Sequence, residues 1–141
     1  VADARKNMVF SLADKANTVN DLGFTGLNQP SGLVVRDGII YVADSGNNRV
    51  LTLRPGSSSP PTPLPFTGLT EAGGLTVDSV GAVYVTDRKR NLVLKLPPGV
   101  GQPVTLPFKD LDTPWGLAVG DDGTVYVAGH NNKILTLQQP K

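Results

Sequence analysis

Short apolar runs separated by turn residues are the dominant pattern along this chain. Three of these runs share the form Gly-Leu-x-Val and lie at residues 32–35, 74–77 and 116–119. Because they are apolar at successive positions, they predict strands that are buried on both faces. Each is followed by a turn rich in Asp and Gly and then by a β-branched and aromatic run, at 39–43, 83–86 and 125–128. A turn of this kind between two such runs is typical of a β-hairpin.

Two further strands complete each unit. A third apolar run lies at residues 50–53, 93–96 and 134–137, and a Pro-containing segment follows at 62–66 and 104–108. Proline cannot donate to a β-ladder, so this fourth strand is expected at a sheet edge. No window of about 11 residues has the period of an amphipathic helix. The chain is therefore predicted to be all-β, built from four-stranded antiparallel sheets.

This four-stranded unit repeats along the chain. The first glycine of each first strand recurs every 42 residues, at Gly32, Gly74 and Gly116. A Phe after each fourth strand keeps the same spacing, at Phe24, Phe66 and Phe108. Repeats of about 40–45 residues with four strands each are typical of β-propellers, in which every blade covers the face of its neighbour. We therefore predict a run of propeller blades.

The repeat divides the chain into a single partial β-propeller, residues 1–141. Residues 1–24 match the last three strands of a blade, 32–66 and 74–108 are whole blades, and 116–137 is a blade without its outer strand. The chain thus holds about three to three and a half blades, whereas closed propellers need four to eight. We expect either part of a six-bladed ring or a ring that a second copy of the chain completes.

Composition and charge narrow the possible functions. The formal net charge of +1 gives no indication of a nucleic-acid partner, and the absence of cysteine excludes disulfides and thiolate metal sites. No apolar run approaches the roughly 20 residues that span a bilayer, and charged residues interrupt the N-terminal segment where a signal peptide would lie. Any membrane anchor is therefore expected outside this sequence.

The repeated residues resemble a known family. The pattern Gly-Leu-x-Val, then Val-Tyr-Val-x-Asp, then Asn-x-Val-x-x-Leu resembles the NHL repeat. The linkers at 22–28, 64–69 and 106–111 follow Leu-Pro-Phe-Thr-Gly-Leu, which is similar to extracellular sensor domains of mycobacterial receptor Ser/Thr kinases. The resemblance implies NHL-type blades on the outer side of a bacterial membrane, where they bind an extracellular ligand or protein. A kinase domain would lie outside this chain, which has neither a Gly-rich loop with Lys nor a His-Arg-Asp motif.

An Asp and an Asn recur at the end of the second strands. The Asp residues are Asp3, Asp44 and Asp87, with Asn7, Asn48 and Asn91 four positions later; the last unit has Gly129 and Asn132. Such a pair could line an ion site. Because it recurs in every unit but the last, we favour a structural turn in which these side chains bond nearby backbone N–H groups.

Strand alternation gathers the remaining candidates at one end of the sheets. The loops between second and third strands and the linkers between blades should share one end, which we call the loop face. Seven of the 13 Lys and Arg residues lie there: Arg5, Lys6, Arg49, Arg88, Lys89, Arg90 and Lys133. The opposite turns hold Asp37, Asp78, Asp121 and Asp122 with only Arg36. A basic loop face suits an anionic partner.

We therefore predict a non-catalytic binding module without metal or cofactor, using loop-face contacts. The candidate contact residues are Trp115, His130, Arg49, Arg88, Arg90 and Lys133. His130 is the only histidine, which disfavours a metal site or a catalytic triad, and Trp115 is either a packing residue or a ligand platform. The alternatives are an NHL-type lyase, an RNA-binding NHL module, disfavoured by the 6% aromatic content, and a truncated or engineered propeller.

Overall fold

The computed structural model describes residues 1–12 and 18–139, and all of their regular strands belong to antiparallel sheets. The first sheet contains β1 (Ala2–Asp3), β2 (Met8–Leu12) and β3 (Val19–Asp21). The second contains β4 (Pro30–Arg36), β5 (Ile39–Asp44), β6 (Arg49–Leu53) and β7 (Thr62–Pro63). The third contains β8 (Ala72–Val77), β9 (Val83–Asp87), β10 (Leu92–Leu96) and β11 (Val104–Thr105). The fourth contains β12 (Gly116–Val119), β13 (Val125–Ala128) and β14 (Ile134–Leu137).

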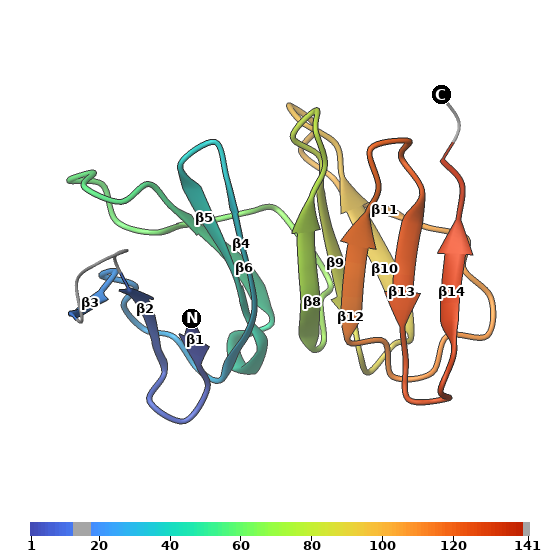
Figure 1. The fold of residues 1–141 in the computed structure, drawn as a ribbon, viewed down its shortest axis with the longest axis horizontal. Coiled ribbons are helices and arrows are strands. Elements are labelled where there is room, and N and C mark those ends of the chain that lie inside the picture. The colour runs from blue at the N-terminus through green and yellow to red at the C-terminus, as the bar shows by residue number, and fades with distance from the viewer. Residues whose placement is uncertain (13–17, 140–141) are drawn as a thin grey trace.

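Within each sheet the strands are hydrogen-bonded in chain order, as in a propeller blade. The four sheets follow one another from the first at the left of Figure 1 to the last at the right. The β4–β5, β8–β9 and β12–β13 turns lie at the top of that view, and the β1–β2, β5–β6, β9–β10 and β13–β14 loops lie at the bottom. The expected all-β fold of propeller blades is therefore confirmed, and so is the separation of the two kinds of loop.

The core consists of apolar layers between successive sheets. One layer packs Val50 and Phe66 of the second unit against Val85 and Leu94 of the third. Corresponding layers lie between the first and second sheets, around Val9 and Val42, and between the third and fourth, around Val93 and Val127. Each layer places one apolar face of a sheet against the opposite face of the next, as radial blade packing requires.

The fourth strands are shorter than the sequence predicts. Regular pairing is confined to Thr62–Pro63 and Val104–Thr105, although the sequence suggested strands reaching 66 and 108. Pro65 and Pro107 have no N–H to donate, so pairing stops soon after Leu64 and Leu106, whose N–H groups bond Val50 O and Val93 O at 2.9 Å. The Phe that follows then turns into the layer between sheets.

The only helical element in the described part of the chain is a short 3-10 turn, η1 (Ser45–Asn47), between β5 and β6. Among those same residues, no helix is long and apolar enough to cross a membrane.

Candidate functional site

The recurring Asp residues attach the loop face to the linkers between sheets. Asp44 is fully buried and accepts hydrogen bonds from the backbone N–H of Asn28 at 2.7 Å, from Asn47 Nδ2 at 2.8 Å and from Arg49 Nε at 2.7 Å. Asp87, also fully buried, accepts from Thr70 N at 2.9 Å and Thr70 Oγ1 at 2.7 Å. Both carboxylates are thus occupied by the chain itself.

The recurring Asn residues hold the linkers from the other side. Asn7, Asn48, Asn91 and Asn132 all have left-handed backbone conformations, with φ between 53° and 56°. Asn tolerates this conformation better than most residues. Asn7 Oδ1 accepts from Gln29 N at 2.7 Å and Asn91 Oδ1 accepts from Thr113 N at 2.8 Å. The linkers that enter the second and fourth sheets are therefore held by the Asn of the sheet before them, and the linkers that enter the second and third sheets are held by the Asp of the sheet they enter.

The interpretation of these residues as turn formers is confirmed most directly by Asp3, which accepts from the N–H groups of Arg5 and Lys6 at 3.0 and 2.9 Å. The sequence did not show that Asp44 and Asp87 reach linkers 16 and 17 residues away. In the last unit, Gly129 replaces the Asp because a Cβ there would lie 2.5 Å from the carbonyl oxygen of Asp112.

Two of the six candidate contact residues hold linkers through their side chains. Arg49 donates to Asp44 and, through Nη2, to the carbonyl oxygen of Gly26 at 3.0 Å. Arg90 donates through Nη1 to the carbonyl oxygen of Gly68, also at 3.0 Å. Gly26 and Gly68 occupy the same place in successive linkers, and Asn131 makes the corresponding bond to Asp110 O at 3.2 Å. These side chains hold linkers on their sheets, and the charge of Arg49 is also balanced by Asp44.

A polar groove of about 740 Å³ crosses the loop face of the first three sheets. It is lined by Ala4, Arg5, Asn7, Asn28, Gln29, Ser31, Ser45, Gly46, Asn48, Thr70, Glu71, Arg88 and Lys89. Arg88 forms an ion pair with Glu71, with 3.1 Å between Nη1 and Oε1, while Arg5 and Lys89 are exposed. The positive charge available in the groove therefore comes from Arg5 and Lys89.

A smaller hollow of about 200 Å³ adjoins the groove through Ser31 and Arg88. It is lined by Ser31, Gly32, Gly73, Gly74, Arg88 and Trp115. The exposed fraction of Trp115 is 54%, so the indole is accessible beside a half-buried guanidinium. The structure thus brings two of the six candidates, Arg88 and Trp115, to one hollow.

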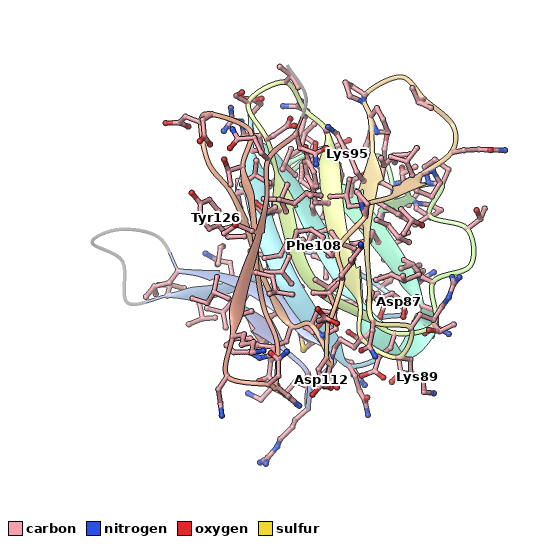
Figure 2. The ribbon with its side chains drawn as sticks, turned by 90° about the vertical axis from the view of Figure 1, so that its right-hand side faces the viewer. Asp87, Lys89, Lys95, Phe108, Asp112 and Tyr126 are labelled. Atoms are coloured by element: carbon pink, nitrogen blue, oxygen red, sulfur yellow. The ribbon has the colours of Figure 1, made fainter. Side chains whose placement is uncertain are left out.

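His130 and Lys133 lie elsewhere on the loop face. Both are exposed in the β13–β14 loop and neither lines the groove or the smaller hollow. Figure 2 shows the loop-face end of the third and fourth units, with Asp87, Lys89 and Asp112 together, opposite Lys95. No group of three or more His, Asp or Glu side chains suited to a metal ion occurs within residues 1–12 and 18–139.

The sequence named Arg5 and Lys89 as loop-face residues but not as contacts, and it did not single out Asn28, Gln29 or Ser31. Spacing alone could have found Asn28 and Gln29, because they occupy the linker position that the recurring Asp and Asn hold.

Comparisons with known proteins agree with this architecture. A model of the NHL repeat matches residues 27–53. A streptogramin B lyase structure is similar with a TM-score of 0.75 and 18% identity, over 97% of this chain and 49% of that one. A structure of the nidogen/laminin complex is similar with a TM-score of 0.74 and 20% identity, over 86% of this chain and 48% of that one. A structure of virginiamycin B lyase from Staphylococcus aureus has a TM-score of 0.59 and 20% identity, over 79% of this chain and 42% of that one.

The search of curated proteins gave no match. At these identities the structural likeness shows the fold, and the chain spans about half the length or less of these neighbours. The chain is a partial β-propeller that contains a detected NHL repeat.

Proposed function

We propose that this chain is a non-catalytic binding module that holds an acidic segment of a partner protein in the polar groove of the loop face. The single observation that carries the proposal is the groove itself, about 740 Å³ in volume and lined by loops of three successive sheets. Its walls are fixed in place, because Asn7 and Asp44 hold the linker at residues 28–29 from both sides. A preorganised surface loses less conformational entropy on binding.

The charges in the groove favour an acidic partner. Arg5 and Lys89 are exposed, whereas Glu71, the acidic residue of the lining, is already paired with Arg88. A carboxylate-bearing segment can approach Arg5 and Lys89 without facing an unpaired negative charge in the groove. Asn28, Gln29 and Ser31 add polar side chains along the same wall. Such a surface improves encounter rate and selectivity more than raw affinity.

The finer part of the proposal concerns the cellular role. The linker motif resembles that of the extracellular sensor domain of the mycobacterial receptor kinase PknD, and we propose the same kind of role here. The module would lie on the outer side of a bacterial membrane, with its anchor and kinase domain outside this sequence. It would report binding by clustering or reorienting the anchored protein. A propeller in the nidogen/laminin complex offers a precedent for protein binding by this architecture.

The proposal is tested with a fluorescein-labelled hexaglutamate peptide and fluorescence anisotropy. The double variant Arg5→Ala/Lys89→Ala should bind the peptide about five- to tenfold more weakly than the wild type, because two favourable charge contacts are lost. Raising the salt concentration should reduce wild-type binding in the same assay. Melting temperatures should agree, since neither side chain makes a hydrogen bond with residues 1–12 or 18–139.

The matched control is Arg36→Ala/Arg54→Ala, which removes the same charge from the opposite end of the sheets. It should leave the affinity for hexaglutamate unchanged. Equal weakening by both double variants, or no binding by the wild type, would contradict the groove as the binding site.

A further inference from the structure

One residue of the last sheet is exposed where its counterparts are buried. Val9, Val50 and Val93 occupy the same position in the third strands of the first three units, and each is fully buried. The fourth member of the set is Ile134, which is 72% exposed. The second strands show the same contrast on the same face, since Tyr84 is 1% exposed and Tyr126 is 42% exposed. We call this surface of β12–β14 the trailing face; Figure 2 shows this sheet nearly edge-on, with Tyr126 on its left, on the side away from Phe108.

The first sheet is uncovered on the opposite face, the one that in later sheets packs against the sheet before. Leu53 and Leu96 are 8% and 6% exposed, but the corresponding Leu12 of β2 is 66% exposed. Phe10 and Leu12 border an apolar hollow of about 540 Å³, which Leu33, Val35 and Ile40 of the second sheet also line. We call the uncovered surface of the first sheet, which carries Phe10 and Leu12, the leading face.

Each internal layer of the molecule joins one trailing face to one leading face. Val50, on the trailing face of the second sheet, packs with Val85, Leu94 and Leu96 of the third. Val93 and Tyr84, on the trailing face of the third, pack with Val125 and Val127 of the fourth. A trailing face thus packs against a leading face in each of the three layers within the chain. The two faces that are left uncovered are one trailing face and one leading face.

We infer that a second copy of this chain docks its leading face on the trailing face of the first, placing Leu12 of one copy beside Ile134 of the other. The inference is independent of the proposed groove function. A contact between two different faces is heterologous, so it either closes into a ring or propagates. Two copies supply eight sheets, which lies within the range of closed propellers, so a ring of two is the expected product.

The inference is tested by sedimentation of the 141-residue chain over about a hundredfold range of concentration. The wild type should reach a mass about twice the 14.8 kDa of one copy. Ile134→Asp and Leu12→Asp should each be monomeric, because every junction in either homodimer would bury one carboxylate. An equimolar mixture of the two variants should form a dimer. In that heterodimer, the unchanged Ile134 of the Leu12→Asp copy meets the unchanged Leu12 of the Ile134→Asp copy, so one of the two junctions is the wild-type one.

Val80→Asp is the matched control, because Val80 is 73% exposed in the β8–β9 turn, away from both faces. It should dimerise as the wild type does. A monomeric wild type at every concentration would overturn the inference. So would an Ile134→Asp monomer combined with an undiminished Leu12→Asp dimer, which would indicate pairing of two trailing faces.

A second measurement remains informative even if the Asp variants unfold. The chain has no cysteine, so Ile134→Cys and Leu12→Cys introduce single thiols. Under mild oxidation the mixture of these two variants should form a disulfide-linked heterodimer, and neither variant alone should crosslink efficiently. Crosslinking of Ile134→Cys with itself as readily as with Leu12→Cys would refute the head-to-tail arrangement.

Discussion

Asp44 and Asp87 are carboxylates with no exposed surface, and both accept hydrogen bonds from the linkers that enter their sheets. At the residue scale these contacts explain why an acidic residue recurs at the end of a second strand. A buried carboxylate is stable when several N–H and O–H groups donate to it. The last unit has Gly129 at the position of this Asp. The backbone there lies close to the carbonyl oxygen of Asp112 and leaves no room for a side chain.

Replacing Asp87 with Ala should lower the free energy of unfolding by about 2–4 kcal/mol. The substitution leaves the backbone N–H and the hydroxyl of Thr70 without their acceptor in a partly buried place. Urea denaturation measures the change. Asp121→Ala, in an exposed turn at the opposite end, is the control and should change stability by less than about 0.5 kcal/mol. Equal effects of the two variants would show that the contacts of Asp87 contribute little.

Tyr84 provides a pH-dependent test at the same scale. Burial, followed by the hydrogen bond from its hydroxyl to Asp78 Oδ2 at 2.9 Å, raises the pKa of Tyr84 well above its usual value near 10. Because the pKa of Tyr84 is raised in the folded state, its contribution to the free energy of unfolding is fully present below about pH 10. That contribution is lost as the pH rises from there through the pKa of the folded state.

Tyr84→Phe should therefore be less stable than the wild type by about 1–2 kcal/mol near neutral pH, and the difference should narrow above pH 10. Chemical denaturation at a series of alkaline pH values measures it. Tyr126→Phe, at the corresponding but exposed position, is the control and should change stability near neutral pH by less than about 0.5 kcal/mol. A difference that stays constant to high pH would refute the role of the Tyr84 hydroxyl.

At the element scale, the inner strands of neighbouring sheets approach one another closely through glycine. A Cβ on Gly74 of β8 would lie 2.3 Å from the carbonyl oxygen of Trp115, just before β12. A Cβ on Gly32 of β4 would lie 2.5 Å from the carbonyl oxygen of Gly73. In the second and third units, the glycine that opens the repeat therefore allows one inner strand to pack against the next, and Trp115 lies at the small hollow beside this contact.

Gly74→Ala should consequently destabilise the protein by about 1–3 kcal/mol, because β8 and β12 must move apart to admit the methyl group. Thermal or urea denaturation measures the loss. Gly101→Ala is the matched control, since a Cβ at this exposed linker position meets no atom within 4 Å. Loss of stability in the control but not at Gly74 would contradict the close approach of the inner strands.

At the scale of the whole molecule, the radial order of the sheets has two consequences. It gathers the β1–β2, β5–β6 and β9–β10 loops at one end, which creates the polar groove from segments far apart in the chain. It also leaves one trailing face and one leading face uncovered among the described residues, with Ile134 and Leu12 exposed. Ligand binding and association of copies therefore concern different surfaces and can be tested separately.

The sequence by itself determined the sheets, since strand identity depends on local patterns. The apolar runs, the Asp-Gly turns and the 42-residue spacing located the first three strands of the repeated unit, and the prolines correctly placed the fourth at a sheet edge. Strand alternation also placed the loops at the correct ends. These properties follow from backbone geometry and nearest neighbours, which the order of residues encodes directly.

Only the tertiary structure decided which charged residues remain available for a partner. Arg49 and Arg90 look like free cations in the sequence, but each donates to a linker carbonyl more than 20 residues away. The sequence likewise presents Val50 and Ile134 as equivalent, although one is fully buried and the other exposed. The reason is physical: burial and hydrogen bonding depend on which neighbouring segment covers a residue, and a local pattern that is identical in every repeat cannot specify that.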